Sequence, residues 1–267
     1  MNQDQVKESL LAVEDAPAEF SVIFSGKKSG KVNGLYKPET REIILHNRNF
    51  SGDPEGDNLL LYTAIHEYAH HLHACARGGT LSARAHTSEF WALFHGLLEK
   101  AEAKGIHRNV FASSRDLEKL TEAIKKKFLE ENGALVKELG RQLLLASELC
   151  EKIGGRFEDY LDRVLRIPKP AAHAAIRMYQ YDLDPRTGPD NMRYLAGIRN
   201  EDARSGAEQS LLGGKSPDSV KIALRNFSAG EGEDPKQRLE KEKNRLEKTI
   251  TTLTRRLEEV QQELRRL

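Results

Sequence analysis

The sequence has few cysteines, the residues whose disulfides stabilise small secreted domains. Two cysteines, Cys75 and Cys150, occur in 267 residues. They are too few for a disulfide framework, so we expect reduced, buried thiols. No stretch approaches the 18 or so apolar residues of a membrane span. The acidic, polar start also lacks the basic residues and apolar run of a signal peptide. We therefore expect a cytoplasmic protein without membrane contact.

An excess of charge of either sign is also missing. The chain has 42 Lys+Arg and 41 Asp+Glu, a net charge of +1. This excludes a strongly basic nucleic-acid coat protein or an acidic tail protein, although a local basic patch stays possible. Charged residues still make up 31% of the chain, which indicates extensive solvated helix surface. The histidines, in contrast, are concentrated in one part of the chain, because six of the nine lie between His66 and His95.

The first part of the chain, residues 1–110, predicts a small α+β domain. A helix is expected over residues 5–14. Turns at residues 26–30 and 37–40 are typical of hairpins. They separate three β-rich runs, residues 19–25, 31–36 and 41–47. We therefore predict a small antiparallel sheet. Two helices follow, over residues 58–76 and 87–104, with a loop at 77–86 and a helix cap at Thr87 or Ser88.

The first of these two helices carries the pattern H-E-x-x-H, formed by His66, Glu67 and His70. Residues i and i+4 lie on one helix face, so the two imidazoles are able to hold one Zn²⁺. Glu67 would then act on a zinc-bound water as general base and pass the proton to a leaving amine. The next residue, His71, is expected to face solvent.

A catalytic zinc site needs a third protein ligand. His86 is the first candidate, because it follows the Gly-rich loop and precedes the next helix. Glu89, one turn further on, is the alternative ligand or else orients an imidazole. His73 is i+3 from His70 and is a candidate for the pocket rim or the second layer around the metal. Tyr36, Tyr62 and Tyr68 are candidates for an oxyanion donor, and nothing in the sequence selects among them. The strand at residues 31–36 is a candidate edge for an extended substrate.

These motifs resemble those of a known group of enzymes. Residues 19–105 are similar to the minimal zinc metallopeptidases of the SprT-like, YgjP-like and WLM group. There the H-E-x-x-H helix is followed by a His-x-x-Glu-Phe-type segment whose histidine is the third ligand. The resemblance implies a zincin fold and a protease-type site, with His66, His70 and His86 as ligands and Glu67 as the catalytic residue. The order of domains resembles that of the ImmA/IrrE group, whose third ligand is instead a glutamate.

The middle of the chain, residues 111–230, predicts an all-helical domain. Residues 155–179 are typical of a helix, a short turn and a second helix, and faintly resemble a helix-turn-helix. The second helix would present Lys169, His173 and Arg177 to DNA. The alternative is a plain bundle that packs on the catalytic domain or binds a protein partner.

The end of the chain, residues 235–267, follows a polar, Gly-rich linker at 228–235 and predicts a coiled coil. Its apolar residues repeat with a 4-3 spacing over about four heptads, with Lys243 at one a position. The d positions are Leu239, Leu246, Leu253, Val260 and Leu267, and the remaining a positions are Ile250, Leu257 and Leu264. We expect a parallel homodimer. The alternative is a single amphipathic helix folded back on its own domain.

Together these features predict a zinc-dependent metallopeptidase. It would hydrolyse peptide bonds of a protein or peptide substrate, with Glu67 activating the attacking water. The additional helices favour selective, regulatory cleavage of a partner protein over general digestion. The alternative is a dimeric DNA-binding regulator whose zinc domain is structural or vestigial.

Overall fold

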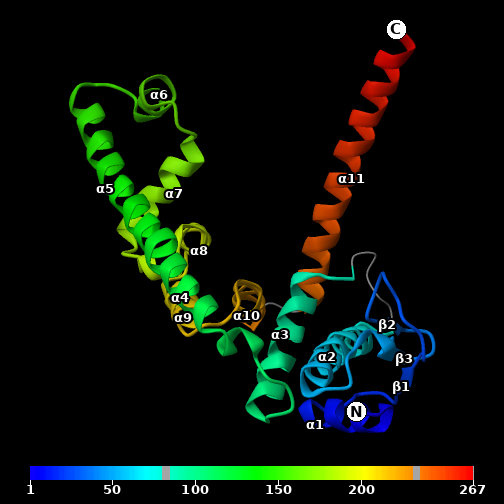
Figure 1. Ribbon diagram of the computed structural model, residues 1–267. Helices are drawn as coiled ribbons and strands as arrows, with labels where there is room; N and C mark the ends of the chain where they lie inside the picture. The colour runs from blue at the N-terminus through cyan, green and yellow to red at the C-terminus, as the bar shows by residue number, and fades with distance from the viewer. Residues whose placement is uncertain (80–84, 231–234, 267) are drawn as a thin grey trace. The chain divides into compact units, whose positions relative to one another are not determined.

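The computed structural model describes residues 1–79, 85–230 and 235–266. It is mostly helical, with one three-stranded sheet (Figure 1). The chain divides into two compact units, Met1–Ala223 and Leu224–Leu267. The predicted domain boundary at residue 110 falls inside the first unit and stays a prediction. No helix in the described part of the chain has the length and apolarity that crossing a bilayer requires.

The first helix, α1 (Gln3–Val13), begins with a capping box. The Asn2 side chain accepts a hydrogen bond from the Gln5 backbone, and the Gln5 side chain accepts one from the Asn2 backbone. This reciprocal pair satisfies backbone donors at the helix start, so the helix begins two residues before the predicted position. Val6, Leu10 and Val13 repeat at helical spacing, and all three are buried in the core.

The sheet is mixed, which corrects the prediction of an antiparallel sheet. Its strands are β1 (Ser21–Phe24), β2 (Gly34–Lys37) and β3 (Glu42–Leu45), in the order β1-β3-β2. The turn at residues 38–41 does form the predicted hairpin, since β2 and β3 pair antiparallel. However, β1 pairs parallel with β3. The segment at 26–30 is therefore part of a crossover rather than a hairpin turn.

The crossover between β1 and β2 is fixed by side chains that follow the sheet. The Asn49 amide nitrogen donates to the Ser29 carbonyl at 2.8 Å, and the Asn49 amide oxygen accepts from the Ser29 N–H at 2.9 Å. The Asn47 side chain accepts from the Gly26 N–H. Both asparagines lie in a short 3-10 turn, η1 (Asn47–Asn49), directly after β3. These bonds fix the segment between β1 and β2 at the end of the sheet. The third strand, β3, therefore occupies the central position between β1 and β2.

Two helices complete the first core. The helix α2 (Pro54–Ala76) begins four residues before the predicted start, because Asp53 caps it and Pro54 occupies its first position. The helix α3 (Ser88–Ala103) is capped by Thr87, one of the two predicted cap residues. The middle of the predicted loop at 77–86 lies outside the described residues. The buried residues of α1, the sheet, α2 and α3 form one hydrophobic core.

The rest of the first unit is helical, as predicted. The longest helix of this later part is α5 (Glu131–Lys152), which packs closely on α7 (Lys169–Gln180). Their contact requires a glycine at position 140, because a Cβ there would lie only 2.0 Å from the Ala175 carbonyl oxygen. Cys150 lies in this second core, while Cys75 is only partly buried. The other elements are η2 (Val110–Ser113), α4 (Arg115–Ile124), the π-helical η3 (Lys125–Glu130), α6 (Phe157–Tyr160), the π-helical η4 (Leu161–Leu165), η5 (Pro185–Thr187), α8 (Pro189–Leu195), α9 (Glu201–Leu212) and α10 (Pro217–Gly230).

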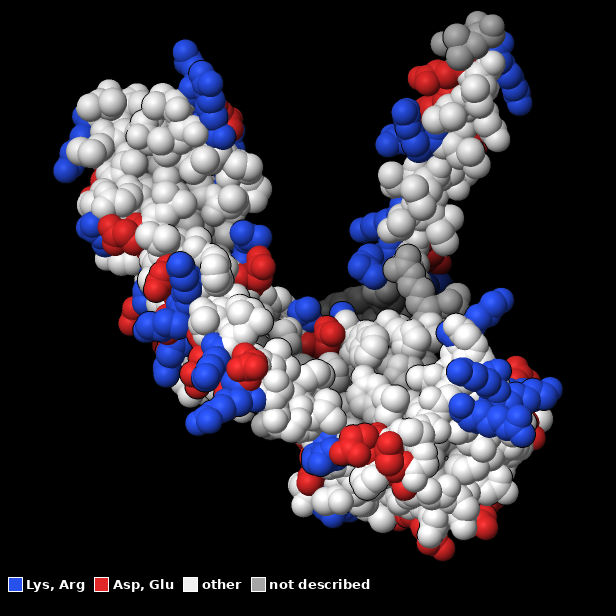
Figure 2. Space-filling view, viewed as in Figure 1, with Lys and Arg blue, Asp and Glu red and all other residues white. Residues whose placement is uncertain are grey.

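The predicted DNA-contacting side chains of α7 have partners within the chain. Lys169 pairs with Asp162 at 2.7 Å. The Arg177 Nε donates to the Ala196 carbonyl at 2.9 Å, and the His173 ring contacts the Phe157 ring. On the face seen in Figure 2, the helices that follow α3 in the first unit carry both acidic and basic side chains, interspersed rather than gathered into one basic surface. The helix-turn-helix function stays a prediction, and these pairings do not favour it.

The second unit contains the end of α10 and one long helix, α11 (Pro235–Arg266). The predicted linker begins inside α10, and residues 231–234 lie outside the described residues. The predicted heptad side chains from Leu239 to Leu264 are exposed, between 36% and 67% for the apolar ones. The predicted position Leu267 is not described. The coiled coil stays a prediction: a partner helix that covered this exposed 4-3 stripe would stabilise it.

We predict that Ile250→Asp converts a dimeric protein into a monomer. A carboxylate at an a position would be buried without a partner in the helix–helix seam, so we expect the dimer dissociation constant to rise at least ~100-fold. Sedimentation velocity at micromolar concentration measures the change. Thr251→Asp, one residue further on and outside the seam, is the matched control and should stay dimeric. A monomeric wild-type protein would contradict the prediction and favour the folded-back helix.

Candidate metal centre

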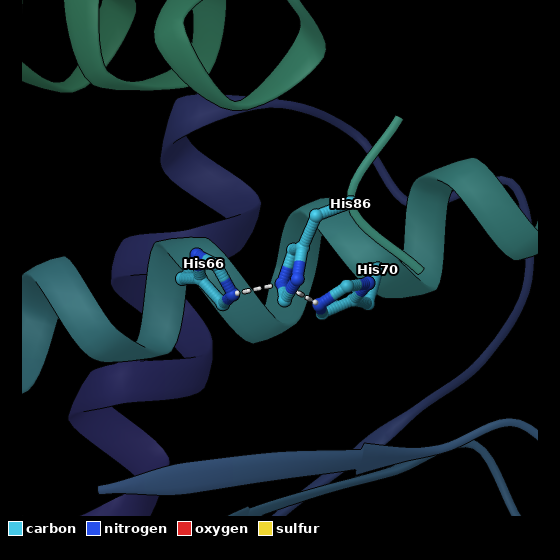
Figure 3. Close-up of side chains that lie close together, drawn as sticks. All are labelled: His66, His70 and His86. Atoms are coloured by element: carbon cyan, nitrogen blue, oxygen red, sulfur yellow. Dashed lines mark hydrogen bonds between the residues drawn. The ribbon is translucent and has the colours of Figure 1, made fainter. Parts of the chain in front are cut away.

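Three histidine side chains meet over the middle of α2. His66 and His70 are one turn apart on α2, and His86 reaches them from the segment before α3 (Figure 3). The His86 Nε2 lies 3.1 Å from the His66 Nε2 and 3.2 Å from the His70 Nε2. Nitrogen ligands of a tetrahedral zinc ion at about 2.0–2.1 Å lie about 3.3 Å apart. The three residues are therefore positioned to hold a metal ion, as the sequence predicted.

Burial keeps the two helical histidines in the neutral form that binds metals. Desolvation lowers the pKa of His66 to about 4, and the neighbouring His86 lowers it further. Desolvation likewise lowers the pKa of His70 to about 3, with smaller contributions from the other histidines. A metal ligand must be deprotonated. At neutral pH both imidazoles are therefore ready to bind without first losing a proton.

Aromatic side chains of α3 hold the three imidazoles in place. The Phe90 ring stacks on His70 at a centroid distance of 4.2 Å, and the Trp91 ring stacks on His86 at 5.4 Å. The Phe94 ring meets His66 edge-on at 5.1 Å. Phe90 and Phe94 are fully buried, so these contacts restrict the rotamers of the histidines. These aromatic residues of α3 thus shape the candidate metal centre.

Glu67 lies between α2 and the edge strand β2. A Cβ at Gly34 would lie 3.0 Å from both the Glu67 and Thr63 side chains, so the glycine allows β2 to approach. Burial raises the pKa of Glu67 to about 7, and a hydrogen bond from the Tyr36 N–H partly offsets this rise. Glu67 is 7% exposed, and it directly follows the candidate metal ligand His66 in α2. It can exchange a proton near neutral pH.

Glu89 and His73 are not members of the metal-binding group found among the described residues. His73 is buried, and its pKa is lowered mainly by burial and by Arg77, whereas Glu89 acts in the opposite direction. Glu89 therefore lies close enough to influence His73. Its proposed role in orienting a metal ligand stays a prediction.

The expectation that His71 faces solvent is wrong. His71 is fully buried, and its Nε2 lies 3.1 Å from the Ala18 carbonyl. A carbonyl can only accept, so this nitrogen carries the proton and the Nδ1 accepts from the Tyr36 hydroxyl at 3.0 Å. Tyr36 is thus bound to His71, and the Tyr68 hydroxyl donates to the Glu14 carbonyl. Of the three tyrosines, Tyr62 alone has no such bond among those the structure gives for the described residues.

No sequence pattern indicates the contact between Tyr36 and His71. The two residues are 35 positions apart, and His71 looks like one more member of a histidine-rich tract. The contact ties β2 to α2 beside Glu67, which lies one turn before His71. Its effect is to fix the distance between the edge strand and the carboxylate.

Comparisons with protein-family models, with curated proteins and with solved structures find no match. The likeness to the metallopeptidase group therefore depends on the H-E-x-x-H pattern and on the position of His86. The geometry of the site carries the functional argument.

We predict that the metal-free protein is less stable at pH 5 than at pH 7. The pKa values of His66 and His70 lie below their usual 6.5, so between these pH values the unfolded chain binds protons that the folded chain does not. Glu67 opposes this, because its raised pKa of about 7 favours the protonated form in the folded state. After discounting for solvent screening, the net loss is on the order of 1 kcal/mol.

Urea unfolding of the metal-free protein at both pH values measures this loss. The Glu67→Gln variant lacks the carboxyl group whose protonation stabilises the folded state as the pH falls. The free energy of unfolding of this variant should therefore fall more steeply toward pH 5 than that of the wild type. Equal or higher stability of the wild type at pH 5 would contradict the prediction.

Proposed function

We propose that the chain is a zinc-dependent metallopeptidase. The observation that carries the proposal is the convergence of the His66, His70 and His86 side chains on one point, with the buried Glu67 as the residue that follows His66 in α2. A purely structural zinc site usually has four protein ligands and needs no adjacent carboxylate. Three ligands leave one coordination position open, as catalytic zinc sites do.

The chemistry of the donor set favours zinc. Neutral imidazole nitrogens suit Zn²⁺, whereas Mg²⁺ and Ca²⁺ prefer oxygen ligands. His66, His70 and His86 would hold the ion. When bound, zinc supplies a Lewis acid that lowers the pKa of water to ~7 and polarises a carbonyl group.

Glu67 supplies the proton transfers of the proposed reaction. Its carboxylate accepts a proton from the attacking water and then delivers it to the leaving amine. The raised pKa of Glu67 suits this shuttle, because proton transfer is most efficient when the pKa of the group lies near the working pH. The hydrogen bond from the Tyr36 N–H and the close approach of Gly34 hold the Glu67 side chain against β2.

The edge strand offers a place for the substrate backbone. In the described sheet, β2 pairs with β3 on one side and ends the strand order on the other. An extended polypeptide could add to this edge through main-chain hydrogen bonds, beside Glu67. The helices after residue 110 favour selective cleavage of a partner protein, consistent with the regulatory role predicted from the sequence.

A chelation experiment tests the proposed function. Purified protein is stripped of metal, and its cleavage of a mixture of proteome-derived peptides is followed by mass spectrometry. We expect no cleavage by the stripped protein and recovery when one equivalent of Zn²⁺ is added. Cleavage that does not depend on metal would contradict the proposal.

A further inference from the structure

A hollow lies between α2, α3 and the segment that follows α3. This pocket has a volume of about 240 Å³. Its apolar walls come from α2, from α3 and from the segment that follows α3; they are Leu59, Tyr62, Leu98, Val110 and Phe111. None of these residues belongs to the metal centre, and sequence reasoning did not single out the pocket.

Helix periodicity places the pocket next to the metal centre. Along α2, Glu55, Leu59 and Tyr62 line the pocket, and His66 and His70 continue the same i, i+3 or i+4 series. The Phe94 ring lies 5.4 Å from the Tyr62 ring and 5.1 Å from the His66 ring. One aromatic side chain of α3 therefore contacts both a pocket wall and a metal ligand.

Hydrogen bonds fix the wall of the pocket that is formed by the segment after α3. Asn58 accepts a hydrogen bond from the Arg108 N–H at 2.8 Å and donates one to the Arg108 carbonyl at 3.0 Å. These two bonds hold the segment that carries Val110 and Phe111. At the polar end, buried His107 lies 3.4 Å from the Glu102 carboxylate, and Glu55 pairs with Arg108. The two carboxylates that line the pocket, Glu55 and Glu102, thus face groups of the chain itself, and the apolar walls are left for an occupant.

The distance from the metal centre to the pocket matches the distance from a scissile bond to a nearby residue of an extended substrate. A helix rises 1.5 Å per residue, so Tyr62 lies ~6 Å and Leu59 ~10 Å along α2 from His66. An extended chain advances ~3.3 Å per residue. A peptide whose scissile carbonyl lies at the metal, and which extends along α2 toward Leu59, therefore reaches the pocket two or three residues away.

We propose that this pocket is a specificity subsite that binds a large aliphatic or aromatic side chain, two or three residues from the scissile bond. The inference rests on the proposed peptidase function and adds the class of substrate. The volume of the pocket suits a side chain of the size of leucine, methionine or phenylalanine. Burying such a side chain in apolar walls should improve kcat/KM about 10- to 100-fold over alanine at the same position.

Peptide-library profiling tests the subsite. The zinc-loaded full-length protein is incubated with proteome-derived peptides, and the residues around each new cleavage are counted against a Glu67→Gln background. The wild type should enrich large apolar residues at one position, two or three residues from the bond. Leu59→Trp and Val110→Trp fill the pocket from two different elements, α2 and η2, at residues that are each 47% exposed. Both should lose the enrichment and still cleave peptides with small residues there.

Leu120→Trp is the matched control, since Leu120 is an exposed leucine of α4 that does not line the pocket. It should keep the wild-type profile. Cleavage without an apolar preference, or a preference that survives in both filled variants, would overturn the subsite and leave the peptidase function intact. No cleavage above the Glu67→Gln background by the wild type would instead refute the peptidase function, and the subsite with it.

Discussion

Replacing Glu67 with glutamine is expected to lower the cleavage rate by ~10²- to 10⁴-fold, the usual contribution of a general acid–base group. The amide has nearly the shape of the carboxylate but cannot accept the proton from water. Glu67 is not among the three residues positioned to hold the metal, so the zinc content should stay at that of the wild type. The fold should also tolerate the change, because burial already favours the uncharged form of this side chain.

Zinc analysis and steady-state cleavage of one peptide measure the two effects separately. Glu99→Gln is the matched control, because Glu99 is an exposed carboxylate on α3 and should keep full activity. If Glu67→Gln cleaved at the wild-type rate, Glu67 would not be the proton shuttle and the catalytic assignment would be wrong.

Replacing His86 with alanine is expected to lower zinc affinity at least ~100-fold, more than the loss usual for residues that only orient ligands. Two imidazoles on α2 would remain, and two ligands make a poor zinc site. His86 is an exposed residue, so its loss should leave the hydrophobic core unchanged. Activity should fall with the zinc content and recover in part at high zinc concentration.

The same experiment separates the two candidates for the third ligand. His173→Ala removes an exposed histidine far along the sequence, on α7, and should keep zinc. Glu89→Gln should also keep zinc, with at most a modest loss of affinity. Unchanged zinc content in His86→Ala, together with loss in Glu89→Gln, would show that Glu89 is the ligand and that the geometry described for His86 is not the bound one.

Local patterns were sufficient to predict much of the site. The i, i+4 spacing of His66 and His70 fixes their relative positions on any helix, and the cap at Thr87 follows from the residue type at a helix start. His86 was predicted from its place before that helix, and the structure brings it to the other two histidines.

Features that depend on distant contacts were not predictable in the same way. The parallel pairing of β1 with β3 depends on how the crossover is held by Asn47 and Asn49, which lie beyond the sheet in sequence. The burial of His71 requires β2 to lie against α2, so that the Tyr36 hydroxyl is present. The pocket beside Tyr62 exists because Asn58 fixes the backbone at Arg108, 50 residues away.

Comparison of the wild type with Glu67→Gln on a complete proteome is the most direct test of the central claim. Both proteins are loaded with zinc, their metal content is verified, and new protein termini are identified by mass spectrometry. Our account predicts a limited set of new termini that appears with the wild type and is absent with Glu67→Gln at equal zinc content. The same termini with both proteins, or none with either, would contradict the claim that this site is a peptidase centre.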